Sequence, residues 1–362
     1  MEYYTETNYI DHDQLRTAGG KGRDDYFEVL RSCGLKCIRI PVVRPAADID
    51  LIQRLKMERD LRRVWKEALS VLGDGDSVVL HSPVSEKFTG YTGLIRDVSR
   101  RGCRIINIVF DLETYFMSDY RRFAGFKHAL DKRTEAALFR ISDVVICHNE
   151  RMKEKLVSAG VPADKIVCVG VMDYLRRDMK LNSGERFTPD KPVVYCGNLA
   201  KGKSGFVYEL PKGIRIDLYG PGFTGKTDND ICYKGVYPAF ELMDLMEGSF
   251  GLVWDGPSSD TCTGACGEYL EYNNPHKMSH YLASGMPVLV WEGAAMAEYV
   301  NAEGCGVTIS ELKEIPSVIS EISDERYAEM RKNAERVGAE MREGSHIRRA
   351  VETALSMVRE NR

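Results

Sequence analysis

The stretch "NNPHKMSHYLASGMPVLVW", residues 273–291, contains one predicted helix followed by one predicted strand. Asn274 is a good N-cap, Pro275 suits the first helical position, and Gly285 ends the helix. The apolar residues that fall on one face of this helix are Met278, Tyr281 and Leu282. The "PVLVW" that follows is apolar throughout, which is typical of a strand covered on both faces of a sheet. The stretch is therefore one unit of an α/β fold.

The residues before this stretch repeat the alternation. Apolar runs of strand length are "CIRIPVV" (37–43), "SVVLH" (77–81), "RIINIVF" (104–110), "DVVICH" (143–148) and "KIVCVG" (165–170). Helix-prone segments lie between them at 51–69, 91–102, 126–140 and 149–160. This order predicts a parallel sheet with helices on both faces, as in a Rossmann-like domain.

A polar segment without periodicity, residues 174–192, marks a linker to a second α/β unit. The predicted strands of that unit are 192–197, 214–220, 250–254, 287–291 and 306–309, and its predicted helices are 238–247, 275–284, 294–302 and 311–321. The tail from Asp324 to Arg362 has a helical pattern throughout. A chain of 362 residues suits two such domains.

Composition indicates a soluble globular protein. The formal net charge of −4 gives no electrostatic bias toward nucleic acid, so we expect no nucleic-acid partner. The N-terminus is acidic and lacks a signal-peptide pattern, and no apolar run approaches the ~18 residues of a spanning helix. We therefore expect a cytoplasmic protein.

Neither cysteines nor acidic triplets indicate a metal site. None of the ten cysteines forms a C-x-x-C pair, and the Cys262/Cys266 pair in "DTCTGACGE" is a weak metal motif. None of the four D-x-D triplets directly ends an apolar strand, so they are interpreted as turns and surface loops, at 11–13, 48–50, 74–76 and 228–230.

Glycines and lysines gather in the loops that follow strands of the second unit. In open α/β sheets, ligands bind beyond the carboxyl ends of the strands. The glycines of these loops are Gly197, Gly202, Gly205, Gly220 and Gly222, and the cations are Lys201, Lys203 and Lys277. This arrangement predicts a pyrophosphate site.

His276 and Lys277 occupy the first turn of the predicted helix, where the macrodipole disfavours cations by about 0.3–1 kcal/mol. A diphosphate at this helix start would explain both residues. The alternative is that Lys277 points into solvent and His276 packs against a neighbour.

The motifs "NNPHKMSHYLASGMPVLVW", "YCGNLAK", "GVYP" and "DVVICHNERMKEKLVSAGV" resemble GT-B glycosyltransferases, most closely the bacterial galactofuranosyltransferase and adhesin-modifying glucosyltransferase group. The resemblance implies two Rossmann-like domains that clamp a nucleotide sugar, usually UDP-linked, and a C-terminal helix that crosses back to the first domain. The implied boundaries are an acceptor-side domain over 1–175 with the helix at about 343–362, and a nucleotide-sugar domain over 176–342.

The same resemblance implies roles for individual residues. Polar and basic contacts to the donor diphosphate fall to Asn198, Lys201, Gly220, Asn274, His276 and Lys277. Val236 and Tyr237 would border the uracil, and Asp260 or Glu268 would hold ribose or sugar hydroxyls. The Gly-rich "TAGGKGRDDYF" opens a helix near Arg23 and matches the glycine loop of the family, so that Gly19, Gly20 and Lys21 help to close the site. A solvated loop is the alternative there.

Candidates for the catalytic base come from the first domain. Asp111 directly follows a buried strand, with Glu113 two residues further on, and either carboxylate suits general-base catalysis. The alternative is that Asp111 caps the following helix. His81 also ends a predicted strand and is a second candidate for the base.

The sequence thus predicts a metal-independent, inverting glycosyltransferase that needs no cofactor beyond its UDP-sugar donor. The transferred sugar would be galactofuranose, galactose or glucose, and the acceptor a glycan, lipid-linked glycan or glycoprotein. A UDP-sugar epimerase and a non-catalytic nucleotide-sugar-binding partner of another transferase are the alternatives. The family resemblance favours a homo-oligomer. Peripheral membrane association stays open, although basic stretches such as "RRVWK" are too short to argue for it.

Overall fold

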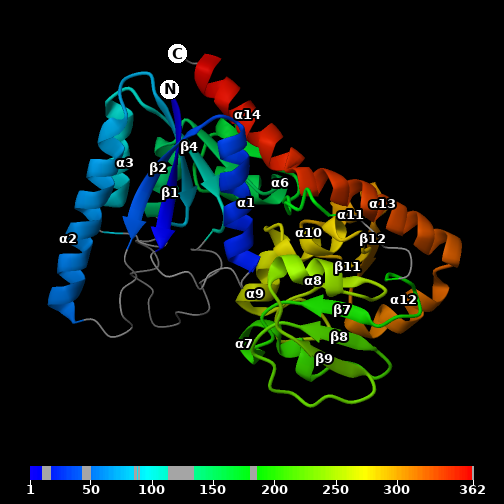
Figure 1. The fold of residues 1–362 in the computed structure, drawn as a ribbon. Coiled ribbons are helices and arrows are strands. Elements are labelled where there is room, and N and C mark those ends of the chain that lie inside the picture. Colours follow the sequence, from blue (N-terminus) through cyan, green and yellow to red (C-terminus); the bar gives the residue numbers. More distant parts are fainter. Residues whose placement is uncertain are drawn as a thin grey trace.

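Two lobes, each built on a parallel sheet, make up the molecule (Figure 1). The structure is a computed structural model, and it describes residues 1–9, 18–42, 50–84, 88, 90–112, 134–179 and 186–360.

The first domain contains a six-stranded sheet in the order β2-β1-β3-β4-β5-β6. All neighbouring strands in it pair in parallel. Chain order reverses between β1 and β3, which makes this pair the switch point of the sheet. Its strands are β1 (Glu2–Tyr9), β2 (Lys36–Val42), β3 (Ser77–Ser82), β4 (Arg104–Val109), β5 (Val144–Cys147) and β6 (Ile166–Cys168).

The second domain repeats this plan with the strand order β12-β11-β10-β7-β8-β9, again parallel throughout. Its switch point lies between β7 and β10. Its strands are β7 (Val193–Cys196), β8 (Ile216–Tyr219), β9 (Ile231–Gly235), β10 (Gly251–Val253), β11 (Val288–Trp291) and β12 (Gly306–Ile309).

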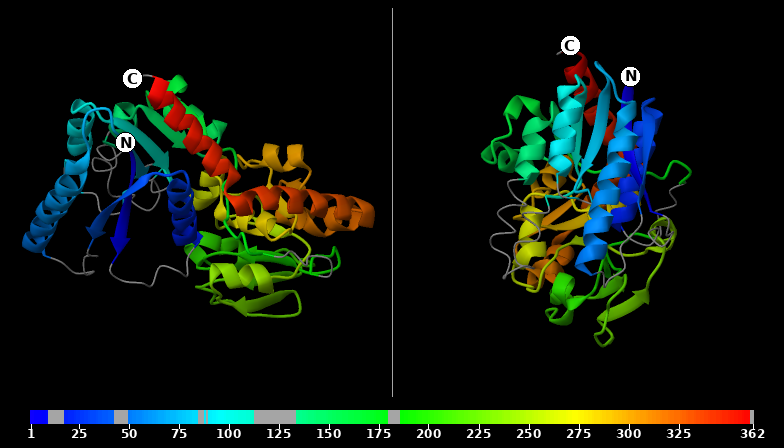
Figure 2. Two further views of the ribbon diagram at one scale, coloured as in Figure 1. Left: turned by 45° about the horizontal axis from the view of Figure 1, so that its top comes forward. Right: turned by 90° about the vertical axis from the view of Figure 1, so that its left-hand side faces the viewer.

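Helices cover both faces of the first sheet. One face packs against α1 and α14, and the opposite face packs against α2 and α3. Figure 2 shows these layers from two sides. Within the described residues, the α-helices with stated bounds are α1 (Ala18–Ser32), α2 (Leu51–Ala68), α3 (Tyr91–Arg100), α6 (Glu150–Ser158), α7 (Lys201–Ser204), α8 (Ala239–Leu245), α9 (Gly264–Glu268), α10 (His276–Ala283), α11 (Ala297–Glu303), α12 (Ile315–Glu321), α13 (Asp324–Glu343) and α14 (Ser345–Glu360).

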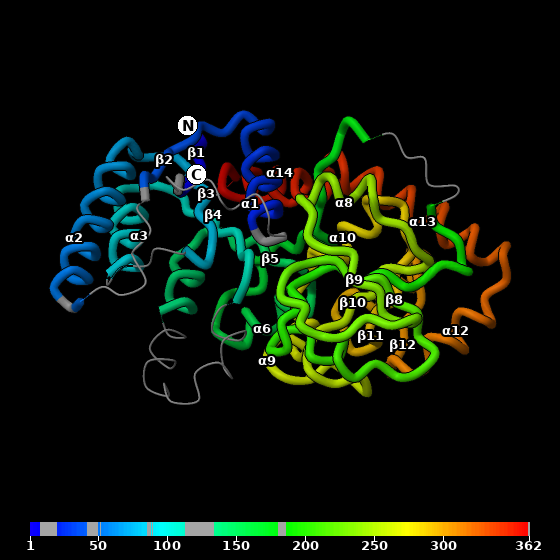
Figure 3. The backbone as a smooth tube through the Cα atoms, turned by 60° about the horizontal axis from the view of Figure 1, so that its bottom comes forward, coloured from blue at the N-terminus to red at the C-terminus, as the bar shows by residue number. Residues whose placement is uncertain are grey.

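The two C-terminal helices join the domains. α13 packs on the second domain through Tyr327, Ala334 and Val337, and Gly344 (φ 76°) ends it in the left-handed region that glycine tolerates. α14 then runs back along the first sheet (Figure 3). Its Ile347 and other apolar residues belong to the core on that face. The predicted crossing of the C-terminal helix is confirmed.

The ten predicted strands are all present, and the inner ones among them are runs of apolar residues buried in a sheet, whereas the edge strands β2 and β12 are only partly buried. Two strands were not predicted. β1, "EYYTETNY", contains tyrosines and polar residues but no aliphatic ones, yet Tyr4 and Thr5 are almost completely buried. β9 is an edge strand whose middle residues are exposed.

Two helix starts differ from the prediction. α1 begins at Ala18 rather than near Arg23, so Gly19 and Gly20 lie in a helical turn and not in a glycine loop. α10 begins at His276, with Pro275 and not Asn274 at the N-cap. The physical reason is that the Asn274 side chain bonds to the first domain instead of capping the helix.

In the described part of the chain, no helix combines the length and apolar character needed to cross a bilayer.

Candidate active site

A polar cluster of the second domain lies at its switch point, at the carboxyl ends of β7 and β10. Lys277, in the first turn of α10, donates from Nζ to the carbonyl of Trp254 and to Oδ1 of Asp255, at 2.9 and 2.8 Å. Nζ also lies 2.9 Å from the hydroxyl of Tyr195, which lies 3.0 Å from the same Asp255 oxygen. The side chains of Lys277 and Asp255 are 10% and 6% exposed. This is a nearly buried ion pair.

A second lysine approaches the same carboxylate. Lys203 Nζ lies 3.9 Å from Oδ2 of Asp255. Burial lowers the pKa of Lys277, and the charge of Lys203 lowers it further, while Asp255 opposes both effects. With both lysines protonated, two cations share one carboxylate and one positive charge is in excess. We call Lys203, Lys277, Asp255 and Tyr195 the lysine cluster.

The cation in the first turn of α10 therefore has an anion beside it within the protein, namely Asp255. His276 carries no charge at neutral pH, because burial lowers its pKa to about 4. Its ring packs against α1 so closely that a methyl group at Gly22 would lie 2.0 Å from the His276 ring. The alternative that His276 packs against a neighbour describes its position in this structure.

The glycine loops beside the lysine cluster pack against each other. The amide of Gly197 donates to the carbonyl of Tyr219, and the amide of Gly220 donates to that of Gly235. Gly220 has φ 132°, and a Cβ there would lie 1.8 Å from the carbonyl oxygen of Gly197. These glycines therefore allow close backbone contact between two loops at the carboxyl edge of the sheet.

Asn198 and Lys201 are exposed at the rim of these loops. The Asn198 side chain accepts from the amide of Ala200 at 3.0 Å, and Lys201 Nζ lies 5.2 Å from the centroid of the Tyr208 ring. The Tyr208 hydroxyl in turn donates to the Leu199 carbonyl at 2.7 Å.

The predicted base and sugar contacts also lie on exposed segments of the second domain. Val236 and Tyr237 follow β9 and are 49% and 36% exposed, with the Tyr237 ring 6.2 Å from that of Tyr219. Asp260 and Glu268 are exposed in the segment that follows β10.

Asn274 is buried between the domains. Its side-chain amide nitrogen donates to the carbonyls of His148 and Gly170, both at 3.1 Å, and its oxygen accepts from Asn149 at 2.7 Å. The Asn274 backbone amide donates to Nδ1 of His148 at 3.0 Å. These contacts connect the start of α10 to the loops after β5 and β6, and we call them the Asn274 network.

Asp111 is exposed at the carboxyl end of β4 and contacts the second domain. The hydroxyl of Tyr269 donates to Oδ1 of Asp111 at 3.2 Å and accepts from the amide of Leu112 at 2.9 Å. Tyr269 begins a 3-10 turn, Tyr269–Glu271, at the end of the segment that follows β10. Glu113 lies outside the described residues.

His81 lies in β3 and is buried between two aromatic rings. The centroid of its ring lies 5.7 Å from that of Phe27 and 5.5 Å from that of Phe110. Burial lowers its pKa to about 3, with a further lowering from Arg23. A buried, neutral imidazole among aromatic rings is poorly placed to accept a proton from a substrate, so this environment argues against His81 as the base.

Both halves of the chain match one protein family. Residues 2–171 match the N-terminal domain and residues 193–354 match the C-terminal domain of the glucosyltransferase 3-like family. The chain belongs to the glucosyltransferase 3-like family.

Two relatives agree with this assignment, and a solved structure shares the fold. The chain is 35% identical to Beta-1,6-galactofuranosyltransferase WbbI of Escherichia coli (strain K12) over 59% of its own length and 63% of that relative. It is 23% identical to Glucosyltransferase 3 of Streptococcus gordonii over 83% of this chain and 85% of that one. The fold matches that of Anabaena HepE, solved with UDP and glucose, with a TM-score of 0.56 at 12% identity and coverage of 98% and 99% of the two chains. The architecture is that of GT-B glycosyltransferases.

In this member of the glucosyltransferase 3-like family, the helix that carries Gly19 and Gly20 lies at the domain junction. Lys21 forms an ion pair with Asp25 of the same helix and donates to the Leu175 carbonyl at 2.9 Å. Burial raises the pKa of Asp25 to about 6, although Lys21 opposes that shift.

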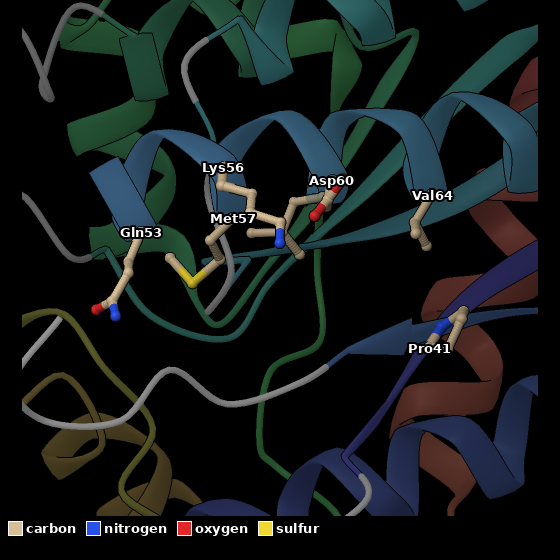
Figure 4. Close-up of a pocket in the computed structure, with 7 residues that line it drawn as sticks. Pro41, Gln53, Lys56, Met57, Asp60 and Val64 are labelled. Carbon is tan, nitrogen blue, oxygen red and sulfur yellow. The ribbon is translucent and has the colours of Figure 1, made fainter. Parts of the chain in front are cut away.

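A hollow of about 300 Å³ lies between α2 and the end of β2 (Figure 4). Its lining is amphiphilic, from Pro41, Gln53, Lys56, Met57, Asp60, Leu61 and Val64. None of the predicted site residues lines it.

Cys262 and Cys266 are buried, and among the described residues no group of three or more His, Cys, Asp or Glu side chains is arranged to hold a metal ion.

Three important residues of the site were not predicted. Asp255 follows the apolar "FGLVW" as Asp111 follows "RIINIVF", so the rule that selected Asp111 could have selected it too. Tyr195 and Tyr269 have no comparable signal, because their roles depend on partners 60 and 158 residues away.

Proposed function

We propose that the protein is a glycosyltransferase that moves a hexose from a UDP-sugar to a glycan acceptor with inversion. The observation that carries this proposal is the lysine cluster at the switch point of the second sheet, where two lysines share one carboxylate. An excess positive charge at this place is suited to a diphosphate. The names of the two relatives support a sugar-transfer reaction.

The donor would bind along the carboxyl edge of the second sheet. Lys201 and the lysine cluster would face the diphosphate, together with the start of α10. Val236 and Tyr237 would border the uracil, and Asp260 or Glu268 would contact hydroxyls of the ribose or sugar. All four are exposed, so a ligand could reach them without a change in the fold.

The reaction would then proceed in one displacement. The carboxylate of Asp111 takes the proton from an acceptor hydroxyl, and the acceptor oxygen forms a bond to the anomeric carbon from the face opposite the diphosphate. The bond from that carbon to the diphosphate oxygen breaks, and UDP leaves with the electron pair. Fixed positive charges at the leaving oxygens stabilise the charge that develops there. On this proposal no metal ion is needed.

The relative WbbI makes galactofuranose the first donor to test, and glucose the second. The first experiment is thermal unfolding with UDP, UDP-galactofuranose, UDP-galactose and UDP-glucose, each with and without EDTA. A ligand that binds only the native state raises its melting temperature. We expect a rise with UDP that EDTA does not change, and no rise with any uridine nucleotide would refute the donor site.

A matched pair of variants localises the binding. Lys201→Ala removes a cation at the carboxyl edge, whereas Lys212→Ala removes an exposed lysine that precedes β8, at the amino edge of the same sheet. UDP affinity should fall only in Lys201→Ala. Release of UDP that depends on an added acceptor would separate a transferase from both an epimerase and a non-catalytic partner.

A further inference from the structure

The hydroxyl of Tyr269 is the point where the second domain contacts the proposed base of the first. It donates to Asp111 and accepts from the amide of the next residue, Leu112. Tyr269 is only 4% exposed, whereas Asp111 is exposed at the domain surface. One side chain of the donor domain therefore fixes both the carboxylate and the backbone that carries it.

Tyr269 is itself held firmly. Its ring belongs to a buried cluster of the first domain, with Val109, Leu112 and Phe139. Its carbonyl accepts from the amides of Tyr272 and Asn273, at 3.0 and 3.1 Å. A tyrosine fixed at both its backbone and its ring can set the orientation of the group to which its hydroxyl bonds.

The hydroxyl of Tyr269 remains a donor over the physiological pH range. Burial raises its pKa well above the usual value, and the charge of Asp111 and the nearby Glu135 raise it further. The bond to Asp111 is therefore one between a neutral phenol and a carboxylate, which is stronger than a bond between two neutral groups.

The segment that carries Tyr269 also begins at the donor site. Asp255 of the lysine cluster lies at its start, and Tyr269 lies near its end. Between them the chain folds tightly: a Cβ at Gly256 would lie 2.3 Å from the Thr263 carbonyl oxygen, and a Cβ at Gly267 would lie 2.7 Å from the backbone of Cys262. Residues 255–269 are thus a compact connection between the proposed diphosphate site and Asp111.

We infer that Tyr269 is a positioning residue that orients the Asp111 carboxylate toward the acceptor, so that the donor domain supplies part of the geometry of the base. The inference rests on the proposed function. It assigns to the segment 255–269 a role in joining donor binding to the orientation of the base, and its buried Cys262 and Cys266 a packing role within that segment.

The test compares Tyr269→Phe, which removes only the hydroxyl, with Tyr327→Phe. Tyr327 is a buried tyrosine whose hydroxyl bonds to the Ser249 carbonyl within the second domain, away from Asp111. Release of UDP from UDP-galactofuranose and UDP-glucose is measured for each protein with octyl galactoside and octyl glucoside as acceptors. Melting temperatures and UDP affinities are measured on the same samples.

We expect Tyr269→Phe to lower kcat by roughly tenfold to a hundredfold, the effect of a small misplacement of a reacting group, with donor KM and UDP affinity unchanged. Tyr327→Phe should keep the kcat of the wild type even if it melts at a lower temperature. In an Asp111→Asn background, Tyr269→Phe should have no further effect on kcat, because the group that it orients is already disabled.

Each other outcome has a distinct meaning. If the wild type is active and Tyr269→Phe keeps full kcat, the inference is overturned and the proposed function stands. Losses that multiply in the double variant overturn it too, since Tyr269 would then act independently of Asp111. If the wild type releases no UDP with any donor and acceptor, the proposed function fails and the inference fails with it.

Discussion

Lys277 Nζ lies 2.8 Å from Oδ1 of Asp255, in a nearly buried pair to which Lys203 adds a second cation at 3.9 Å. A buried ion pair is costly to break, because one charge is left without its partner at about 3–5 kcal/mol. A diphosphate that reaches this cluster would meet cations already fixed in place by Asp255. The carboxylate thus holds the lysines in position but also competes with the nucleotide for them.

The substitution Asp255→Asn separates these two effects. It should destabilise the unliganded protein, by an amount approaching that for a broken buried pair, about 3 kcal/mol. The rise in melting temperature produced by UDP should become larger than in the wild type, because the diphosphate then supplies the missing negative charge.

Lys277→Ala is the matched control, since it also breaks the pair but removes the cation. It should weaken UDP binding by about 1.5–3 kcal/mol, the range for hydrogen bonds to charged groups. Urea unfolding and UDP titration of both variants check these expectations. Equal UDP responses in the two variants would show that the cluster stabilises the fold without binding the nucleotide.

The Asn274 network makes a prediction for stability in the absence of any ligand. Asn274→Ala leaves the carbonyls of His148 and Gly170 and the amide of Asn149 without this partner. An unsatisfied buried polar group costs about 1–3 kcal/mol, so the unliganded protein should unfold at clearly lower urea concentration. An exposed control, Asn198→Ala, should not change the midpoint. Unchanged stability of Asn274→Ala would favour the diphosphate role that the sequence predicts.

The lysine cluster and the Asn274 network show which features of the site could be predicted from the sequence. The apolar strands, the order of helices and strands and the importance of residues 274–277 follow from local pattern, because burial on both faces of a sheet requires apolar runs. The partners do not follow, since Asp255 is 22 residues from Lys277 and His148 is 126 residues from Asn274. Such contacts depend on how the two domains pack.

The missed strands have a similar cause. β1 is an inner strand of the first sheet, between β2 and β3. It was missed because Thr5, Glu6 and Thr7 give it the pattern of a polar segment. Thr5 and Thr7 are nevertheless buried, in surroundings that the other strands supply.

The contact between Gly22 and His276 can be tested with a single methyl group. Gly22→Ala places a Cβ 2.0 Å from the His276 ring, so α1 or the ring must move. Overpacking of this kind costs about 1–3 kcal/mol. Gly93→Ala is the control, because Gly93 lies in α3 and a Cβ there meets nothing within 4 Å. It should be neutral or stabilising by about 0.5–1 kcal/mol. The urea midpoint should therefore fall in Gly22→Ala and stay unchanged or rise in Gly93→Ala, and equal shifts in the two variants would remove the claim of close packing.

Buried histidines predict a loss of stability in mild acid. The pKa of His81 is lowered to about 3 in the folded protein, and that of His148 also to about 3, against about 6.5 when unfolded. Between these values the unfolded chain binds more protons than the folded one, so stability should fall as pH drops below 6.5. Asp25 opposes this slope, because its raised pKa of about 6 favours the folded state at lower pH.

His81→Leu removes one group that binds a proton only in the unfolded chain, and it keeps the buried site apolar. The slope of unfolding free energy against pH between 6.5 and 4 should decrease by up to about 1.4 kcal/mol per pH unit. Urea unfolding at several pH values measures it. The ionisable groups on the surface are the same in the wild type and in His81→Leu, so they contribute equally to both slopes. An unchanged slope would therefore mean that His81 is not buried and neutral.

The base assignment leads to the last prediction. Asp111→Asn keeps the shape of the side chain and its ability to accept from the Tyr269 hydroxyl, but it cannot take a proton from an acceptor. Turnover should fall by about 10²–10⁴-fold, the usual contribution of a general base, while UDP affinity and melting temperature stay close to those of the wild type. Acceptor-dependent release of UDP and UDP titration measure the two quantities.

Asp143→Asn serves as the control, because Asp143 precedes β5 at the amino edge of the same sheet, where it pairs with Arg104. That change should reduce stability without lowering kcat. Full activity in Asp111→Asn would transfer the role of base to Glu113, and the corresponding Glu113→Gln variant would then be expected to lose turnover.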